Sequence, residues 1–141
     1  SDASVDGVLL TDVIENEAGD IAHKFGERNI DLISLIAPTT TDERLEIICA
    51  NASGFVYAVS RAGVTGAQET TSAAAEKLVE RARKFTDLPI AVGFGISTAE
   101  QVADIWRYAD AAVVGSAIVS EIEKANDPVA AVEEFVRQLL P

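Results

Sequence analysis

The sequence predicts an α/β fold in which a parallel sheet alternates with helices. Five short apolar runs recur along the chain and begin about 21 to 35 residues apart, which is the span of one strand and its following helix. They cover residues 8–11, 32–37, 55–59, 90–94 and 111–114. Each run is apolar almost throughout, as expected for strands that are covered on both faces. The pattern therefore indicates five βα units in succession.

Amphipathic helices are predicted between and after these runs, because apolar residues recur there at intervals of three and four. Those residues lie within 18–25, 45–52, 75–85, 102–109 and 129–140. A further short helix is expected directly after the last strand, before the helix that contains 129–140. The helix-start signals are two capping boxes and one N-cap before proline: Thr40 with Glu43, Ser97 with Glu100, and Asp127 before Pro128.

Two architectures fit five parallel βα units in a single domain over residues 1–141. One is part of a TIM (β/α)8 barrel, with about five of its eight strands. The other is a five-stranded doubly wound sheet of the flavodoxin-like type, which 141 residues can complete. The extra short helix after the last strand favours the barrel, whereas the length favours the doubly wound sheet. The pattern alone leaves both open.

The composition excludes some partners. The net charge is −12, from 11 basic and 23 acidic residues, so the surface repels nucleic acid and anionic membranes. No apolar stretch approaches the ~20 residues that span a bilayer. Cys49 is the only cysteine, which excludes an intrachain disulfide and favours a reducing compartment, and we expect a cytoplasmic protein. Cys49 falls on an apolar helix stripe, where we expect it to be buried.

Three turns that contain glycine follow the last three predicted strands. They lie at residues 60–66, 93–97 and 115–119. Strand ends in parallel α/β folds are where ligands bind, and a short helix that follows a glycine directs free backbone N–H groups at an anion. Each turn alone also fits an ordinary loop, but together they favour phosphate binding. With this net charge, the backbone has to supply most of the contacts.

Other residues give weaker signals. Tyr57 lies within the third strand, where it is either a core residue or a hydroxyl that faces a ligand. Asp12 is a carboxylate at the end of the first strand, with either a structural or a proton-transfer role. The polar loop 61–71 fits a lid or a plain surface loop, and Arg61 fits a phosphate contact or an exposed side chain. His23 is expected on the surface. We find no metal-ligand spacing, no nucleotide-binding glycine motif and no catalytic triad, so no metal or cofactor is predicted.

Four segments together resemble the tryptophan synthase alpha chain, in the same order and at similar spacing. They are Asp6-Gly7-Val8-Leu9-Leu10-Thr11-Asp12-Val13, Ser60-Arg61-Ala62-Gly63-Val64-Thr65-Gly66, Gly93-Phe94-Gly95-Ile96-Ser97 and Gly115-Ser116-Ala117-Ile118-Val119. The resemblance covers essentially the whole chain. It implies a TIM barrel that cleaves indole-3-glycerol phosphate to indole and glyceraldehyde 3-phosphate in tryptophan biosynthesis.

The resemblance also implies roles for individual residues. The residues that would bind the substrate phosphate are Gly66, Gly95, Gly115 and Ser116. The residues that would line the substrate pocket are Tyr57, Phe94 and Asp12. The lid would contain Arg61, Gly63 and Thr65. The family pairs with a beta chain, and residues 14–17, in the region that faces this partner, depart from the family pattern.

The resemblance begins at the fourth strand of the family, so the catalytic glutamate and aspartate have no counterpart here. We therefore expect a phosphate-binding C-terminal segment, a fragment of the lyase that is inactive alone. Its first and last strands would be open edges, which favours a homo-oligomer. The alternative is a phosphometabolite-binding module or an engineered half-barrel scaffold without catalysis.

Overall fold

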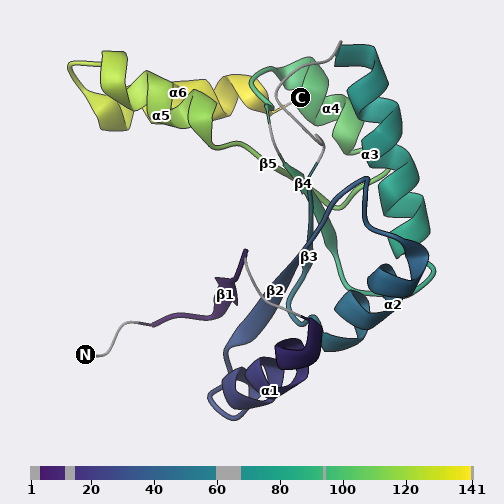
Figure 1. Cartoon of the computed structure of the whole chain (residues 1–141). Helices are drawn as coiled ribbons and strands as arrows, with labels where there is room; N and C mark the ends of the chain where they lie inside the picture. Colours follow the sequence, from purple (N-terminus) through teal and green to yellow (C-terminus); the bar gives the residue numbers. More distant parts are fainter. Residues whose placement is uncertain (1–3, 12–14, 60–67, 94, 141) are drawn as a thin grey trace.

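The computed structural model describes residues 4–11, 15–59, 68–93 and 95–140 of the chain. Within them, five strands form a parallel sheet in the order of the sequence (Figure 1). The strands are β1 (Gly7–Leu9), β2 (Asp31–Ile36), β3 (Val56–Val59), β4 (Ile90–Gly93) and β5 (Ala111–Val113). The five predicted strands are thus confirmed, with ends that differ by one or two residues at most.

The helices alternate with the strands as expected. They are α1 (Glu15–Gly26), α2 (Asp42–Asn51), α3 (Gln68–Ala82), α4 (Ala99–Ile105), α5 (Ser116–Lys124) and α6 (Pro128–Leu139). The extra short helix after β5 is confirmed as α5. The expected loop over 61–71 is too long, because residues 68–71 belong to the first turn of α3. These four residues are polar, and apolar periodicity does not detect a polar helix start.

Two of the expected helix caps lie one residue further along the chain. Thr41, not Thr40, caps α2, and its hydroxyl accepts from the N–H of Arg44. The hydroxyl of Thr40 instead accepts from the N–H of Ala37 within the preceding turn. Thr98, not Ser97, caps α4 in a capping box completed by Gln101. The third signal is confirmed: Asp127 caps α6 ahead of Pro128.

The strand order rules out the doubly wound alternative. A doubly wound sheet reverses its strand order once, so that its helices cover both faces. Here each strand lies beside its neighbours in sequence, and right-handed crossovers then put every connecting helix on the same face. Figure 1 shows α1 to α4 along the outer side of the curved sheet, with α5 and α6 extending from its β5 end. This is the arrangement of a partial TIM barrel.

The core lies between the sheet and these helices. Ile36, Val56 and Val92 point from neighbouring strands toward the helices and are fully buried. Leu45 of α2 and Leu78 of α3 pack against them and are buried to the same degree. Cys49 is buried as expected, and burial raises the pKa of its thiol, which leaves it in the unreactive protonated form. The apolar core therefore lies between the outer face of the sheet and the helices that cover it.

The inner face of the sheet carries the alternate residues. Leu35, Tyr57, Ala91 and Ala111 are paired across β2 to β5, so their side chains form one row on this face. Gly93 follows in the next row. A Cβ atom at Gly93 would lie 2.0 Å from the Tyr57 hydroxyl oxygen and 3.1 Å from Cβ of Val113. Glycine is thus required there because the Tyr57 ring lies over the backbone of β4.

Asp110 fixes the start of β4 against the start of β5. One carboxylate oxygen accepts from the backbone N–H of Ile90 over 2.7 Å and from Nη2 of Arg83 over 2.6 Å. The N–H of Asp110 donates back to the carbonyl of Ile90. The Ile90 N–H, and secondarily Arg83, holds the pKa of Asp110 below its usual value. These contacts join β4 to β5 at the amino ends of the two strands.

We predict that Gly93→Ala destabilises the fold by about 1–3 kcal/mol, because the new methyl group displaces the Tyr57 ring and crowds Val113. Urea unfolding of the two proteins measures the difference. Gly26→Ala, at the last residue of α1, is the matched control, since a Cβ atom there meets nothing within 4 Å. An unchanged unfolding midpoint for Gly93→Ala would contradict the tight contact over β4.

We predict that Asp110→Asn lowers stability at pH 7 by on the order of 1 kcal/mol. Because folding lowers the pKa of Asp110, its contribution is fully present above the unfolded value of about 3.9 and is lost as the pH falls through the folded pKa. The difference between variant and wild type should therefore shrink at low pH. Urea unfolding at pH 7 and near pH 3 measures this, with the exposed Asp87→Asn as control. A difference independent of pH would refute the assignment.

Candidate functional site

The turn after β4 brings one expected phosphate contact to the carboxyl edge of the sheet. Gly95 has a φ of +74°, in the left-handed region that favours glycine. Ile96, one residue later, is buried and anchors the turn in the core. The backbone of Gly95 is exposed. Gly95 therefore presents main chain at this edge.

The turn after β5 ends in a helix start that no side chain caps. Gly115 is the N-cap of α5 and, lacking a side chain, leaves the first N–H groups of the helix unbonded by a cap. Ser116 is the first helical residue and is exposed. The first turn contains no acidic residue that would neutralise the positive end of the helix dipole. By contrast, side chains of Thr41, Thr98 and Asp127 cap α2, α4 and α6.

The strand register places these two turns next to each other. Gly93 is paired with Val113 across β4 and β5. Gly95 and Gly115 each follow this pair by two residues, so both lie just beyond the carboxyl ends of neighbouring strands. The exposed backbone at Gly95 and the N–H groups at the start of α5 therefore belong to one edge of the sheet.

Tyr57 lies on the inner face of the sheet, in the row below Gly93. Its side chain is half-buried, and burial raises the pKa of its hydroxyl, which stays protonated and can donate a hydrogen bond. Among the described residues, none forms a hydrogen bond with the Tyr57 hydroxyl, which lies against the backbone of Gly93. Tyr57 thus combines an apolar ring with a polar tip on the concave side of the sheet.

The remaining expected site residues lie outside the part of the chain that the structure describes. They are Asp12, Arg61, Gly63, Thr65, Gly66 and Phe94. Asp12 follows β1, Phe94 separates Gly93 from Gly95, and the other four precede α3. Their expected roles remain predictions.

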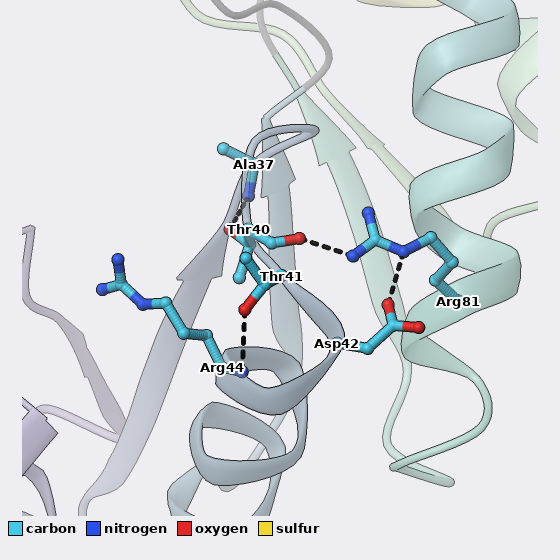
Figure 2. A network of polar contacts seen from close by, with 6 residues as sticks. All are labelled: Ala37, Thr40, Thr41, Asp42, Arg44 and Arg81. Carbon is cyan, nitrogen blue, oxygen red and sulfur yellow. Dashed lines mark hydrogen bonds and ion pairs between the residues drawn. The ribbon is translucent and has the colours of Figure 1, made fainter.

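The turn after β2 has a polar network that the sequence did not indicate (Figure 2). Arg81 of α3 donates from Nε to the Asp42 carboxylate over 2.7 Å and from Nη2 to the carbonyl oxygen of Thr40. A cavity of about 260 Å³ lies beside this turn, with Thr39 and Arg44 in its lining. Arg81 and Asp42 are 39 residues apart, and no local pattern pairs residues at that distance. The network holds the turn to α3.

Within the described ranges, no three histidine, cysteine or carboxylate side chains come together in a way that would hold a metal ion. No helix in those ranges is long and apolar enough to cross a bilayer. His23 lies on the surface of α1 as expected and approaches Glu27 one turn away.

Comparison with known proteins places the chain in one family. The family model described as tryptophan synthase alpha chain matches residues 1–139. The curated alpha chain of Zymomonas mobilis is 46% identical over 142 residues, which cover 98% of this chain and 52% of the relative. That of Methanocaldococcus jannaschii is 45% identical, covering 89% of this chain and 45% of the relative. The chain thus spans about half the length of the curated relatives it matches.

Two solved structures that resemble this chain are also tryptophan synthases. A mutant alpha subunit of tryptophan synthase from Pyrococcus furiosus superposes with a TM-score of 0.83 at 36% identity, covering 96% of this chain and 55% of that one. A tryptophan synthase from M. tuberculosis in an aminoacrylate-bound form gives 0.79 at 32% identity, covering 94% and 48%. Both the sequence and the partial barrel therefore lead to the same conclusion: this chain belongs to the tryptophan synthase alpha chain family.

Proposed function

We propose that this chain is the phosphate-binding part of a tryptophan synthase alpha-type lyase, which cleaves indole-3-glycerol phosphate to indole and glyceraldehyde 3-phosphate in the cytoplasm. The observation that carries the proposal is the start of α5. Its N–H groups have no side-chain cap, and they lie beside the exposed turn at Gly95. A phosphate at a helix N-terminus accepts such N–H groups and is favoured by the helix dipole.

The net charge of the protein is compatible with a phosphate site built from backbone N–H groups. A net charge of −12 repels a phosphate at long range. Binding then depends on donors that contact the phosphate directly, namely the N–H groups that follow Gly115 and the hydroxyl of Ser116. In this proposal Gly66 completes the phosphate site from the turn after β3. Weak binding by the 141-residue chain is the expected consequence.

The pocket walls and the lid are part of the same proposal. Tyr57 faces the concave side of the sheet, where a substrate held by its phosphate at the β4–β5 edge would extend. Phe94 and Asp12 would contribute further walls, and Arg61, Gly63 and Thr65 would belong to the lid. Tyr57 offers ring surface for an indole group and a hydroxyl for a polar contact.

The chemistry requires groups beyond these residues. Proton transfer to the indole ring and from the glycerol hydroxyl takes a general acid and a general base. In the family these are a glutamate and an aspartate without counterparts in the 141 residues. We therefore propose that this chain alone binds the substrate and does not turn it over. A tryptophan synthase beta chain, and a second copy of this chain at the edges of the described sheet, are the proposed partners.

We predict that Gly115→Asp weakens phosphate binding at least roughly tenfold. The new carboxylate would occupy the free N–H groups of α5 and repel the anion. The same change should leave stability unchanged or raise it by up to about 1 kcal/mol, because aspartate is a good N-cap. Titration of the ¹⁵N-labelled chain with inorganic phosphate and with indole-3-glycerol phosphate, followed at the Ser116 amide, measures binding.

The matched control for this variant is Ala130→Asp, which adds the same charge in the first turn of α6, at an exposed position. It should bind phosphate as the wild type does. Undiminished binding by Gly115→Asp, or an equal loss in both variants, would refute the α5 site and leave a scaffold without this ligand as the better interpretation.

We predict that the purified chain releases no indole from indole-3-glycerol phosphate above the uncatalysed background. Addition of the first three βα units of the Zymomonas mobilis relative, which would carry the missing carboxylates, should restore release. An indole assay with and without that segment measures both. Turnover by the chain alone would show that its own residues supply the acid and the base, contrary to the proposal.

A further inference from the structure

The side-chain amide of Gln101 makes one more hydrogen bond than its helix cap requires. Gln101 lies in the first turn of α4, and its Oε1 accepts from the backbone N–H of Thr98 over 3.2 Å. With the bond from the N–H of Gln101 to the Thr98 hydroxyl, this completes the capping box. The same Oε1 also accepts from the N–H of Ser97 over 2.8 Å. Ser97 precedes the N-cap, so this additional bond restrains the turn before the helix.

The turn between β4 and α4 depends on this bond because packing restrains only part of it. Ile96 is buried in the core and fixes one point of the turn. Ser97 and Thr98, by contrast, are exposed. Their N–H groups are the ones that the Gln101 amide binds. Burial of Ile96 and the amide of Gln101 therefore restrain neighbouring residues of the described part of the turn.

Gly95 directly precedes this restrained segment. It has no side chain through which packing could hold it, so the position of its main chain follows from the residues on either side. On one side lies β4, whose last residue Gly93 is paired with Val113 of β5. On the other side lies the segment that Gln101 binds. The amide of Gln101 thus helps to determine how the exposed main chain of Gly95 lies relative to the start of α5.

The acceptor at Gln101 is neutral, although glutamate is the other residue that serves in a capping box. The first turn of α4 already contains Glu100, and its own backbone N–H, and secondarily the Thr98 hydroxyl, hold the pKa of that carboxyl below its usual value. The start of α4 therefore has side-chain acceptors and a negative charge, whereas the start of α5 has neither. An amide at Gln101 restrains the turn without adding a second negative charge beside an anion site.

We propose that Gln101 is a positioning residue of the phosphate site. By accepting from the N–H groups of Ser97 and Thr98, its side chain holds the main chain of Gly95 beside the start of α5, and it acts through the turn without contacting the phosphate. This inference rests on the proposed function, in which Gly95 and the start of α5 bind the same phosphate. It adds a residue whose side chain lies in a helix cap and not in the site.

The first test compares Gln101→Ala with the wild type in phosphate binding. We expect roughly fivefold to tenfold weaker binding, because the apparent affinity falls with the fraction of chains whose turn has the binding geometry. Titration of the ¹⁵N-labelled chain with inorganic phosphate, followed at the Ser116 amide, measures this. Gln138→Ala is the matched control, since it removes an exposed glutamine amide that bonds Glu134 within α6, and it should bind as the wild type does.

The second test uses Gln101→Glu, which keeps an oxygen acceptor for both N–H groups. Amide hydrogen exchange at Ser97 and Thr98 should be slow in the wild type and in Gln101→Glu, and roughly tenfold faster in Gln101→Ala. In about 0.3 M sodium chloride, which screens the added charge, Gln101→Glu should also recover most of the phosphate affinity that Gln101→Ala loses. A residue that only stabilised the fold would change the unfolding midpoint without this selective loss and recovery.

The outcomes separate this inference from the proposed function. A wild type that does not bind phosphate refutes the proposed function, and the positioning role fails with it. A wild type that binds phosphate and a Gln101→Ala variant that binds equally well refute the positioning role alone. The positioning role is also overturned if Gln101→Glu keeps slow exchange at Ser97 and Thr98 but binds phosphate as weakly as Gln101→Ala in the same salt.

Discussion

The single-sided covering of the sheet is the constraint on which the rest of this structure depends. Because the strands follow one another in sequence order, the crossover helices all lie on the outer face and build the apolar core there. The inner face keeps side chains such as Tyr57 that are only half-buried. Among the described residues, no connecting helix covers the concave side. The position of Tyr57 on that side follows from this asymmetry.

The amino and carboxyl ends of β4 and β5 differ in their polar contacts. At the amino end, Asp110 ties β4 to β5 through the backbone of Ile90. At the carboxyl end, Gly95 is exposed, and the start of α5 after Gly115 has no side-chain cap among the described residues. Backbone N–H groups at a helix start can bind an anion without any basic side chain. An excess of acidic residues elsewhere on the protein is therefore compatible with an anion site of this kind.

Much of the candidate site could be predicted from local sequence. Glycines directly after apolar strands indicated the turns at Gly95 and Gly115, since register and parallel direction bring such turns to one edge. The requirement for glycine at Gly93 could not be predicted, because it arises from the Tyr57 ring on a neighbouring strand. The contact of Arg81 with Asp42 was likewise missed, since it joins helices that are distant in sequence.

The sequence by itself determined the five βα units, the extra helix α5 and the family. These features depend on apolar periodicity and short motifs, which are properties of residues close together in the sequence. The cap of α2 was predicted one residue too early, at Thr40. The Thr40 hydroxyl accepts from Ala37 in the preceding turn, which leaves the hydroxyl of Thr41 to cap the helix. Only the tertiary structure decided between a barrel segment and a doubly wound sheet. Strand order depends on which distant backbone groups pair, and predominantly apolar strands look alike in sequence in either fold.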